Sequence, residues 1–197
     1  MNNEKPLVTA NISNRHAHVS ETDLHVLFGE GSALTPMRDL MQPGQFACNE
    51  TITIATDKSE IPNVRIIGPT RKYTQVEVSA TDARHLKLEK IPPVRDSGNL
   101  EGSSPITIIG PKGRIDLRQG CIIAKRHIHL HTEDAKKLGV SNMQLVNVRA
   151  GRAGDKTLVF EKMLCRVADS MAFECHIDTD EANACGLKNG EKVEILL

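Results

Sequence analysis

One short pattern occurs twice in this chain of 197 residues. Residues 15–19 and residues 126–130 both read basic–His–apolar–His–apolar, 111 positions apart. Because side chains alternate between the two faces of an extended strand, the two histidines of each copy point to the same face. Two imidazoles at this spacing suit a borderline metal ion such as zinc. The repeat takes up half of the eight histidines, which favours two metal-binding strands over histidines that are merely hydrogen-bonded.

The composition excludes several classes of function. Lys and Arg together number 25, as do Asp and Glu, so no excess charge attracts nucleic acid or an anionic membrane. Aromatic residues make up 3% of the chain, too few for a surface that stacks single strands. The first residues lack the apolar core of a signal peptide, and no apolar run reaches membrane-spanning length. The five cysteines are scattered without a Cys-x-x-Cys motif, which is typical of reduced thiols in the cytoplasm.

The hydrophobic pattern predicts a mainly-β chain. Expected strands cover residues 7–13, 46–55, 64–68, 71–79, 106–109, 114–117, 121–130, 145–150, 157–167, 172–177 and 192–197. Residues 29–44 and 97–104, which are rich in turn-forming residues, are expected to be loops. Many short strands combined with a few short helices favour a barrel-like architecture.

The sequence predicts four short helices that begin in the same way: a strand ends at a polar capping residue, and the helix starts directly after it. The four capping residues are Ser20, Ser79, His131 and Asp178. Two positions before each of them lies a side chain that can bind a metal, namely His18, Glu77, His129 and His176. On an alternating strand this side chain shares the face of its capping residue. The second and fourth copies align at an offset of 99 residues, so the duplication extends beyond the histidine pattern.

Each half of the chain therefore offers three candidate ligands. They are His16, His18 and Glu77 in the first half, and His127, His129 and His176 in the second. Three protein ligands are typical of a catalytic zinc site, which keeps a position for substrate or water. The competing interpretation places Glu77 and His176 on the surface near a helix start, where a carboxylate gains a little from the helix dipole. The repeat also leaves open whether a trio draws all its ligands from one half.

Arg71 has no counterpart in the duplication, since Ser170 occupies the matching position. On a regular strand it would share a face with Glu77, six residues further on. An arginine beside two cations is unfavourable unless an anion joins them, and phosphate fits because Arg binds it through a bidentate fork. The competing interpretation is an ordinary surface arginine.

His25, His85 and His131 are expected at the surface or in caps, and Cys175 is expected to face away from His176.

Five segments, in order over nearly the whole chain, resemble a known family: residues 13–20, 71–79, 93–99, 123–129 and 176–183. They are similar to the PduL-type phosphotransacylases, the phosphate propanoyltransferases. The resemblance implies an enzyme with two zinc ions per chain that interconverts short-chain acyl-CoA (propanoyl-CoA or acetyl-CoA) and phosphate with acyl phosphate and CoA. It also implies a homodimer. The implied fold has two interleaved β-barrel domains capped by short α-helices: residues 15–124, and residues 1–14 with 125–197, the N-terminal strand crossing over.

The same resemblance implies roles for individual residues. The zinc ligands of the family fall on the two trios, and its catalytic arginine falls on Arg71. On this basis we expect zinc at His16, His18 and Glu77 to receive the CoA sulfur. Zinc at the second trio, together with Arg71, is expected to position phosphate and to stabilise the developing charge. Phosphate then attacks the thioester directly, because no Ser or Cys in the sequence has an evident base partner.

Other readings of the sequence lead to different expectations. A zinc-dependent hydrolase of thioesters or phosphoesters would use the same ligands with water as the nucleophile, and a non-catalytic barrel would close each zinc with four ligands. Family members that associate with a bacterial microcompartment shell carry an amphipathic helix before the first strand, whereas residues 1–6 precede it here. We therefore expect a cytoplasmic enzyme or a trimmed N-terminus.

Overall fold

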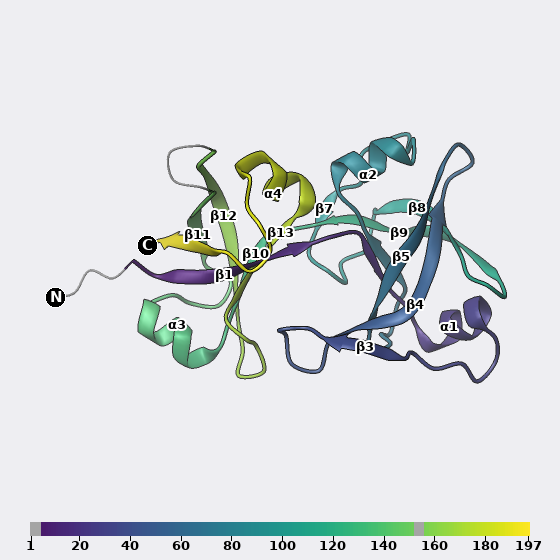
Figure 1. The fold of residues 1–197 in the computed structure, drawn as a ribbon, viewed down its shortest axis with the longest axis horizontal. Coiled ribbons are helices and arrows are strands. Elements are labelled where there is room, and N and C mark those ends of the chain that lie inside the picture. Colours follow the sequence, from purple (N-terminus) through teal and green to yellow (C-terminus); the bar gives the residue numbers. More distant parts are fainter. Residues whose placement is uncertain (1–4, 152–155) are drawn as a thin grey trace. The chain divides into compact units, whose positions relative to one another are not determined.

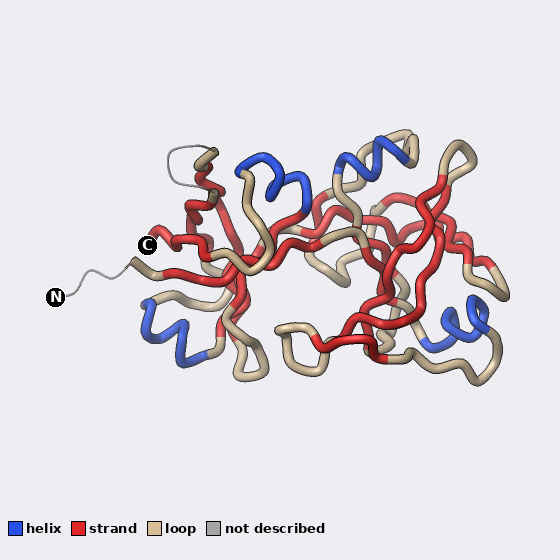
Figure 2. The backbone as a smooth tube through the Cα atoms, in the orientation of Figure 1, coloured by secondary structure: helices blue, strands red, loops and turns tan. Residues whose placement is uncertain are grey.

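The structure, a computed structural model, describes residues 5–151 and 156–197 (Figure 1). These residues form fourteen strands and four short helices, and strands dominate the trace in Figure 2. They divide into two compact units. Unit 1 comprises the described residues of 1–13, 41–43 and 126–197, and unit 2 comprises residues 14–40 and 44–125. The predicted domain limits at residues 15 and 125 stay a prediction, and residues 1–4 of the predicted crossing segment lie outside the described part of the chain.

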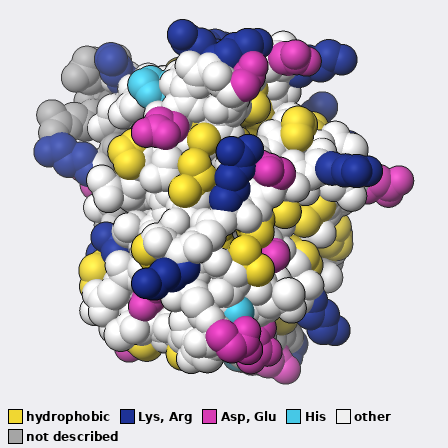
Figure 3. Space-filling view, turned by 90° about the vertical axis from the view of Figure 1, so that its right-hand side faces the viewer, with side chains coloured by type: hydrophobic (Ala, Val, Ile, Leu, Met, Phe, Trp, Pro, Cys, Tyr) yellow, Lys and Arg dark blue, Asp and Glu magenta, His cyan; other side chains and the backbone are white. Residues whose placement is uncertain are grey.

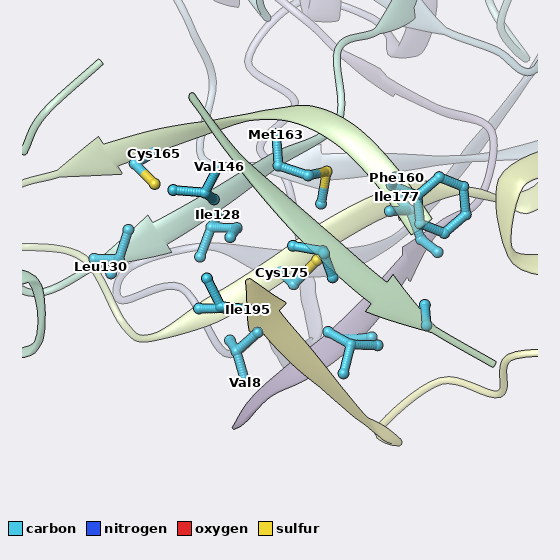
Figure 4. Close-up of a cluster of buried hydrophobic side chains, with 14 of the residues drawn as sticks. Val8, Ile128, Leu130, Val146, Phe160, Met163, Cys165, Cys175, Ile177 and Ile195 are labelled. Atoms are coloured by element: carbon cyan, nitrogen blue, oxygen red, sulfur yellow. The ribbon is translucent and has the colours of Figure 1, made fainter. Parts of the chain in front are cut away.

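Unit 1 is a closed barrel of six strands in the residues described. Around the ring these are β1 (Leu7–Ser13), β13 (Glu174–Asp178), β10 (His127–Leu130), β12 (Leu158–Val167), β11 (Leu145–Ala150) and β14 (Lys192–Leu196). Apolar side chains of these strands meet in one core (Figure 4), where Ile128, Met163 and Cys175 are at most 1% exposed. Removal of this apolar surface from water is the main force that holds the ring together.

Unit 2 closes a second ring of six among its described strands. The ring consists of β4 (Phe46–Ala55), β5 (Glu60–Gly68), β2 (His16–His18), β6 (Gln75–Glu77), β9 (Arg114–Ala124) and β8 (Ser104–Ile109), which pairs with β4 again. Two short strands attach to this ring, β3 (Pro36–Asp39) at β4 and β7 (Val94–Arg95) at β9. Its core includes Ile54, Ile66 and Val76, all fully buried. The predicted mainly-β fold with two barrels is thereby confirmed.

The two rings have the same connectivity. The His-x-His strands β2 and β10 each pair antiparallel with one strand, β6 or β13, and parallel with another, β5 or β12. β6 in turn pairs parallel with β9, and β13 pairs parallel with β1. β1 therefore holds in unit 1 the position that β9 holds in unit 2. Each of these strands is followed in the chain by the His-x-His strand of the other unit, so the duplicated halves are interleaved.

Each of the four described helices begins at its predicted capping residue. The helices are α1 (Glu21–Phe28), α2 (Ala80–His85), α3 (Thr132–Leu138) and α4 (Thr179–Cys185), capped by the side chains of Ser20, Ser79, His131 and Asp178. α2 and α4 have complete capping boxes, in which Asp82 and Glu181 accept a hydrogen bond from the backbone of the capping residue. No helix in the described residues is long and apolar enough to cross a membrane.

Three local predictions are wrong. Residues 29–44, predicted as a loop, contain β3. All four residues of this strand are exposed, so neither of its faces is buried and its sequence lacks the alternation of apolar and polar residues that predicts a strand. The strands predicted at residues 114–117 and 121–130 are divided differently, because β9 runs without a break from Arg114 to Ala124 and β10 begins at His127. The strand predicted at residues 71–79 is shorter, since β6 covers Gln75–Glu77 and the chain bends at residues 72–73. Arg71 instead forms an isolated bridge with Ser20.

Candidate metal centres

Both predicted ligand trios lie on antiparallel strand pairs, β2 with β6 and β10 with β13. The directly opposed residues are His16 with Glu77, His18 with Gln75, His127 with His176, and His129 with Glu174. Opposed residues of an antiparallel pair point to the same face, so each set forms a square of four neighbouring side chains. Three corners of each square are predicted ligands, named below the His16 group (His16, His18, Glu77) and the His127 group (His127, His129, His176). The fourth corners are Gln75 and Glu174.

The ligand atoms of each trio gather in one place. In both groups one nitrogen or oxygen atom from each residue lies within 4.8 Å of the other two. Zinc–nitrogen bonds of about 2.0–2.1 Å would place two ligand atoms of a tetrahedral site about 3.3 Å apart. Imidazole and carboxylate are also the ligands that zinc takes in three-ligand sites. Each trio is brought together within a single unit, and its donor atoms are of the kinds that zinc binds.

Backbone carbonyls orient the two histidines of the His16 group. Nδ1 of His16 lies 2.8 Å from the carbonyl oxygen of Asn14, and Nδ1 of His18 lies 2.9 Å from that of Ile67. A carbonyl oxygen only accepts, so each Nδ1 carries the proton and donates it, while each Nε2 presents a lone pair. Outer hydrogen bonds of this kind fix the rings of metal-binding histidines. Nε2 of His16 lies 3.5 Å from Oε2 of Glu77, and both atoms face the site.

Glu77 is held by a buried amide. Its Oε1 accepts a hydrogen bond of 2.6 Å from Nε2 of Gln75, which is fully buried. This contact fixes the carboxylate and directs Oε2 toward His16. Burial, with smaller effects from His16 and Arg71, lowers the pKa of His18 well below its ordinary value. His18 is therefore neutral at neutral pH, the form that binds metal ions.

The His127 group consists of three imidazoles. The Nε2 atoms of His127 and His129 lie 3.0 Å apart, close to the separation of about 3.3 Å between two nitrogens on one tetrahedral zinc. Nδ1 of His129 lies 3.3 Å from the sulfur of Met171, so its Nε2 points into the group. The rings of His127 and His176 stack with centroids 4.9 Å apart. Burial lowers the pKa of His129 to about 4, with a further effect from His176, and so keeps the ring neutral.

Glu174, at the fourth corner of the unit 1 square, was not predicted as a functional residue. It is 1% exposed and accepts hydrogen bonds from Asn11 Nδ2 (2.8 Å), Gln42 Nε2 (2.8 Å) and His176 Nε2 (2.7 Å). Burial raises its pKa, but these hydrogen bonds, foremost that from His176, outweigh burial and lower the pKa overall. Its signal in the sequence was the alignment with Gln75 at the same 99-residue offset that aligned the third ligands.

The arginine that precedes each His-x-His ties its strand to a helix. Arg15 Nε lies 2.8 Å from Asp82 Oδ1, and Arg126 Nη1 lies 2.6 Å from Glu181 Oε1. Asp82 and Glu181 are the capping-box acids of α2 and α4. Because these four residues are equivalent in the duplication, the basic position of the repeated pattern serves the scaffold that holds the ligands.

Arg71 lies in unit 2 with the His16 group, although not on the regular strand that was predicted. Its Nη1 donates a hydrogen bond of 3.0 Å to Oγ of Ser97, and Nε2 of Gln75 donates one of 2.7 Å to the same oxygen. Since Gln75 also holds Glu77, a chain of hydrogen bonds runs from the guanidinium to a candidate ligand. Ser97 and Gln75 were not predicted individually, although both fall within the segments that resemble the family.

The remaining candidates take the structural roles expected of them. His131 caps α3 through Nδ1, His85 is exposed, and Cys175 is buried in the barrel core rather than beside His176 in its group. His25 lies 3.6 Å from the exposed carboxylate of Glu30. On the face shown in Figure 3, basic and acidic side chains are interspersed and no large area carries one sign of charge.

Comparisons with known proteins agree with the resemblance seen in the sequence. A family model described as phosphate propanoyltransferase matches residues 9–188. A protein of Thermotoga maritima with that name is 51% identical over 98% of this chain and 90% of its own length. Its namesake in Lachnoclostridium phytofermentans is 50% identical, over 96% of this chain and 87% of that protein. The prediction of a transferase enzyme is confirmed at this level, and the chain belongs to the phosphate propanoyltransferase family.

Proposed function

We propose that this protein interconverts short-chain acyl-CoA and phosphate with acyl phosphate and CoA, and that the His16 group and the His127 group each hold one zinc ion. One observation carries the proposal. Two duplicated squares of side chains each gather three metal-binding atoms within 4.8 Å, and Arg71, which has no counterpart in the duplication, joins the hydrogen-bond network of the first square. Family membership supports the acyl transfer, and the names of the relatives make propanoyl the first substrate to test, with acetyl the second.

The proposed reaction exchanges one bond for another. An oxygen atom of phosphate forms a bond to the carbonyl carbon of the thioester. The carbon–sulfur bond then breaks, and its electron pair leaves on the CoA sulfur as a thiolate. Negative charge therefore develops on the carbonyl oxygen and then on sulfur, while the attacking phosphate is itself an anion. A site for this reaction must bind one anion and stabilise the formation of another.

Arg71 is suited to bind the phosphate. A guanidinium offers five donors in a fork that matches two phosphate oxygens. The hydrogen bond from its Nη1 to Ser97 uses one donor and fixes the side chain. Gln75 holds Ser97 from the other side, so the position of Arg71 is coupled to that of Glu77. Prior orientation of a charged group is what allows it to stabilise a transition state without reorganisation.

The two ligand groups add the charge that one arginine cannot supply. When bound, zinc at either group would provide positive charge to the thiolate or the oxyanion that forms in the reaction. The protein side chains prepare for this by presenting neutral imidazole nitrogens. In the His16 group the donation of both Nδ1 protons to carbonyls leaves both Nε2 atoms directed at the site.

The environments of the cysteines and of Ser97 support transfer without an acyl-enzyme. All five cysteines are buried, and burial raises the pKa of Cys48 to about 11 and that of Cys121 to about 12. Thiols of this kind are unreactive, because the thiolate is the nucleophile. Ser97, which contacts Arg71, receives hydrogen bonds from two donors, neither of which can act as a base. We therefore propose direct attack by phosphate.

The test is the release of CoA thiol from propanoyl-CoA and acetyl-CoA, with and without phosphate, on protein whose zinc content has been counted. We expect release that requires both phosphate and zinc. The acyl chain with the higher kcat/KM identifies the preferred substrate. Arsenate in place of phosphate provides a second readout, because an acyl arsenate hydrolyses and draws the reaction to completion.

Two other outcomes would overturn the proposal. Zinc-dependent release that is indifferent to phosphate would identify a hydrolase, in which water takes the place of phosphate at the same ligands. No release from zinc-loaded protein would indicate that the metal ions are structural.

We further propose that the chain is a homodimer, and this rests on family membership alone. Light scattering coupled to gel filtration should give twice the chain mass of 21.6 kDa. A species of one chain mass would contradict the dimer.

Association with a microcompartment shell, which the family resemblance raises, is tested by co-purification with shell proteins from the native cells.

A further inference from the structure

The function proposed above leaves one buried charge without a role. Glu174 is 1% exposed, and burying a carboxylate is unfavourable unless its charge is compensated. Two of its hydrogen-bond partners, Asn11 and Gln42, are neutral amides, and the third is the ring of His176. Such a network suits a place where positive charge is delivered close by.

We propose that Glu174 is a positioning residue of the His127 group: its carboxylate accepts a hydrogen bond from Nε2 of His176 and thereby presents Nδ1 of that ring to the metal ion. This inference rests on the proposed function, because it takes the His127 group to be a metal site. It adds a residue outside the trio and assigns the atom through which His176 binds.

The geometry of the contact determines which nitrogen carries the proton. Oε2 of Glu174 lies 2.7 Å from Nε2 of His176. An ionised carboxylate only accepts, so Nε2 of His176 is the donor, and in the neutral ring that binds metal ions Nδ1 carries the lone pair. Glu174 also lies directly opposite His129 across the strand pair, which places it on the face that carries the three rings. A carboxylate behind a metal-binding imidazole orients the ring and raises its basicity.

The carboxylate is itself held rigidly in place. Oε1 accepts from Asn11, while Oε2 accepts from both Gln42 and His176. Gln42 is 5% exposed and is fixed by a two-way contact with the backbone of Ala172, donating to its oxygen at 3.1 Å and accepting from its nitrogen at 3.2 Å. Both carboxylate oxygens are thus occupied by protein donors, which assigns Glu174 to the support of a ligand rather than to direct binding of the metal.

In the equivalent square of unit 2, the carboxylate is the candidate ligand and the neighbouring residue two positions earlier supports it. There the strand offers an amide at Gln75 and the ligand carboxylate at Glu77, joined by a hydrogen bond of 2.6 Å. In unit 1 the first position is the carboxylate Glu174 and the second is the ligand His176. Each square therefore carries one negative charge next to its metal position. The two barrels thus place a negative charge near the proposed metal ion in different ways, one through a ligand and the other through a residue behind a ligand.

The first test needs no variant. The histidine rings of the zinc-loaded protein, labelled with nitrogen-15, are examined by long-range proton–nitrogen NMR, which distinguishes protonated from metal-bound ring nitrogens. We expect His176 to bind through Nδ1 and to carry its proton on Nε2. His16 and His18 provide the internal reference, because their carbonyl contacts leave Nε2 for the metal. Metal binding through Nε2 of His176 would overturn the inference.

The second test removes the charge of the supporting residue. Glu174→Gln should weaken zinc binding at the His127 group by about 10–100-fold, measured by competition with a chelator, while the ring signals of His16 and His18 stay metal-bound. Glu194→Gln is the matched control, since Glu194 lies on β14 of the same barrel and pairs with Lys5 and Arg149 rather than with a residue of the square. Unchanged zinc affinity in folded Glu174→Gln protein would contradict the inference.

A milder variant covers the case in which Glu174→Gln does not fold. Gln42→Ala keeps the carboxylate and removes one of its donors, so a smaller loss of zinc affinity at the same group is expected, and no loss would count against the supporting network. The inference and the proposed function fail separately. Protein that binds both ions with His176 metallated at Nδ1, yet shows no phosphate-dependent thiol release, would overturn only the acyl transfer. Protein that takes up no metal would overturn both.

Discussion

The His16 group and the His127 group occupy equivalent places in two barrels of identical connectivity, yet their candidate ligand sets differ. β6 offers Gln75 and Glu77, whereas β13 offers Glu174 and His176 at the matching positions. The carboxylate thus lies at the ligand corner of one square and at the supporting corner of the other. The backbone duplication fixes where four side chains meet, and the residue types at two of these positions decide whether the negative charge would bind a metal ion directly or lie behind a histidine ligand.

This difference is expected to matter for the chemistry. A carboxylate bound directly to zinc offsets part of the charge of the ion, whereas one placed behind an imidazole acts through the ring. The two sites therefore present unlike ligand sets on like scaffolds.

The largest effect should come from removing a central ligand. His18→Ala and His129→Ala are each expected to lose the metal of their own group and keep that of the other, because each trio lies within one unit. Loss of several kcal/mol of charge stabilisation corresponds to a fall in turnover of about 10³-fold or more. Zinc content per chain and kcat measure the two effects. Loss of both ions from one single variant would break the comparison, since the groups would then not be independent.

Arg71 should give the next largest effect. Arg71→Ala removes the proposed phosphate contact but no ligand, so turnover should fall about 10²–10³-fold while both zinc ions remain. Arg114→Ala is the control, since Arg114 is an exposed arginine of the same unit that pairs with Asp116. Retained turnover in metal-replete Arg71→Ala protein would remove Arg71 from the mechanism.

Exchanging the residue types at the two differing positions tests the comparison directly. His176→Glu alone should weaken zinc binding, because the new carboxylate would lie beside that of Glu174. Combining His176→Glu with Glu174→Gln recreates in unit 1 the arrangement of Gln75 and Glu77, so zinc affinity should recover to within about 10-fold of the original site. Chelator competition on both single variants and the double variant completes the cycle. Additive losses in the double variant would show that the two squares are not interchangeable.

The smallest effects are expected at the scaffold arginines. Arg15→Ala should lower the free energy of unfolding by about 0.5–1 kcal/mol, as for a partly exposed ion pair. Arg126→Ala should cost about 1–2 kcal/mol, because Arg126 also donates to the carbonyl oxygen of Glu161 and lies 5.6 Å from the centre of the Phe160 ring. Urea denaturation of both variants measures the difference. A larger loss for Arg15→Ala would contradict these contacts.

The sequence predicted those parts of the site that depend on local periodicity. The i, i+2 histidines, the capping residues and the ligands two positions before them follow from strand alternation and helix capping, which involve neighbouring residues. The internal repeat then paired Glu77 with His176 across 99 positions. These features need no knowledge of which strands pair.

The parts that were missed depend on distant strands and loops. Glu174 becomes a candidate only when the register of β10 and β13 sets it opposite His129. Its partners Asn11 and Gln42 come from segments more than 130 positions away in the chain. The position of Arg71 was mispredicted because the chain bends at residues 72–73, and the contact that holds it comes from a loop residue, Ser97. Local patterns carry no information on such pairings.

The most direct test of the two-site claim is a crystal structure of the zinc-loaded protein with anomalous diffraction recorded at the zinc edge. We expect two peaks per chain, one among His16, His18 and Glu77 and one among His127, His129 and His176, each ion with three protein ligands and an open position. A single peak, or a fourth protein ligand that closes either site, would contradict the claim that the duplicated barrels each hold a catalytic metal.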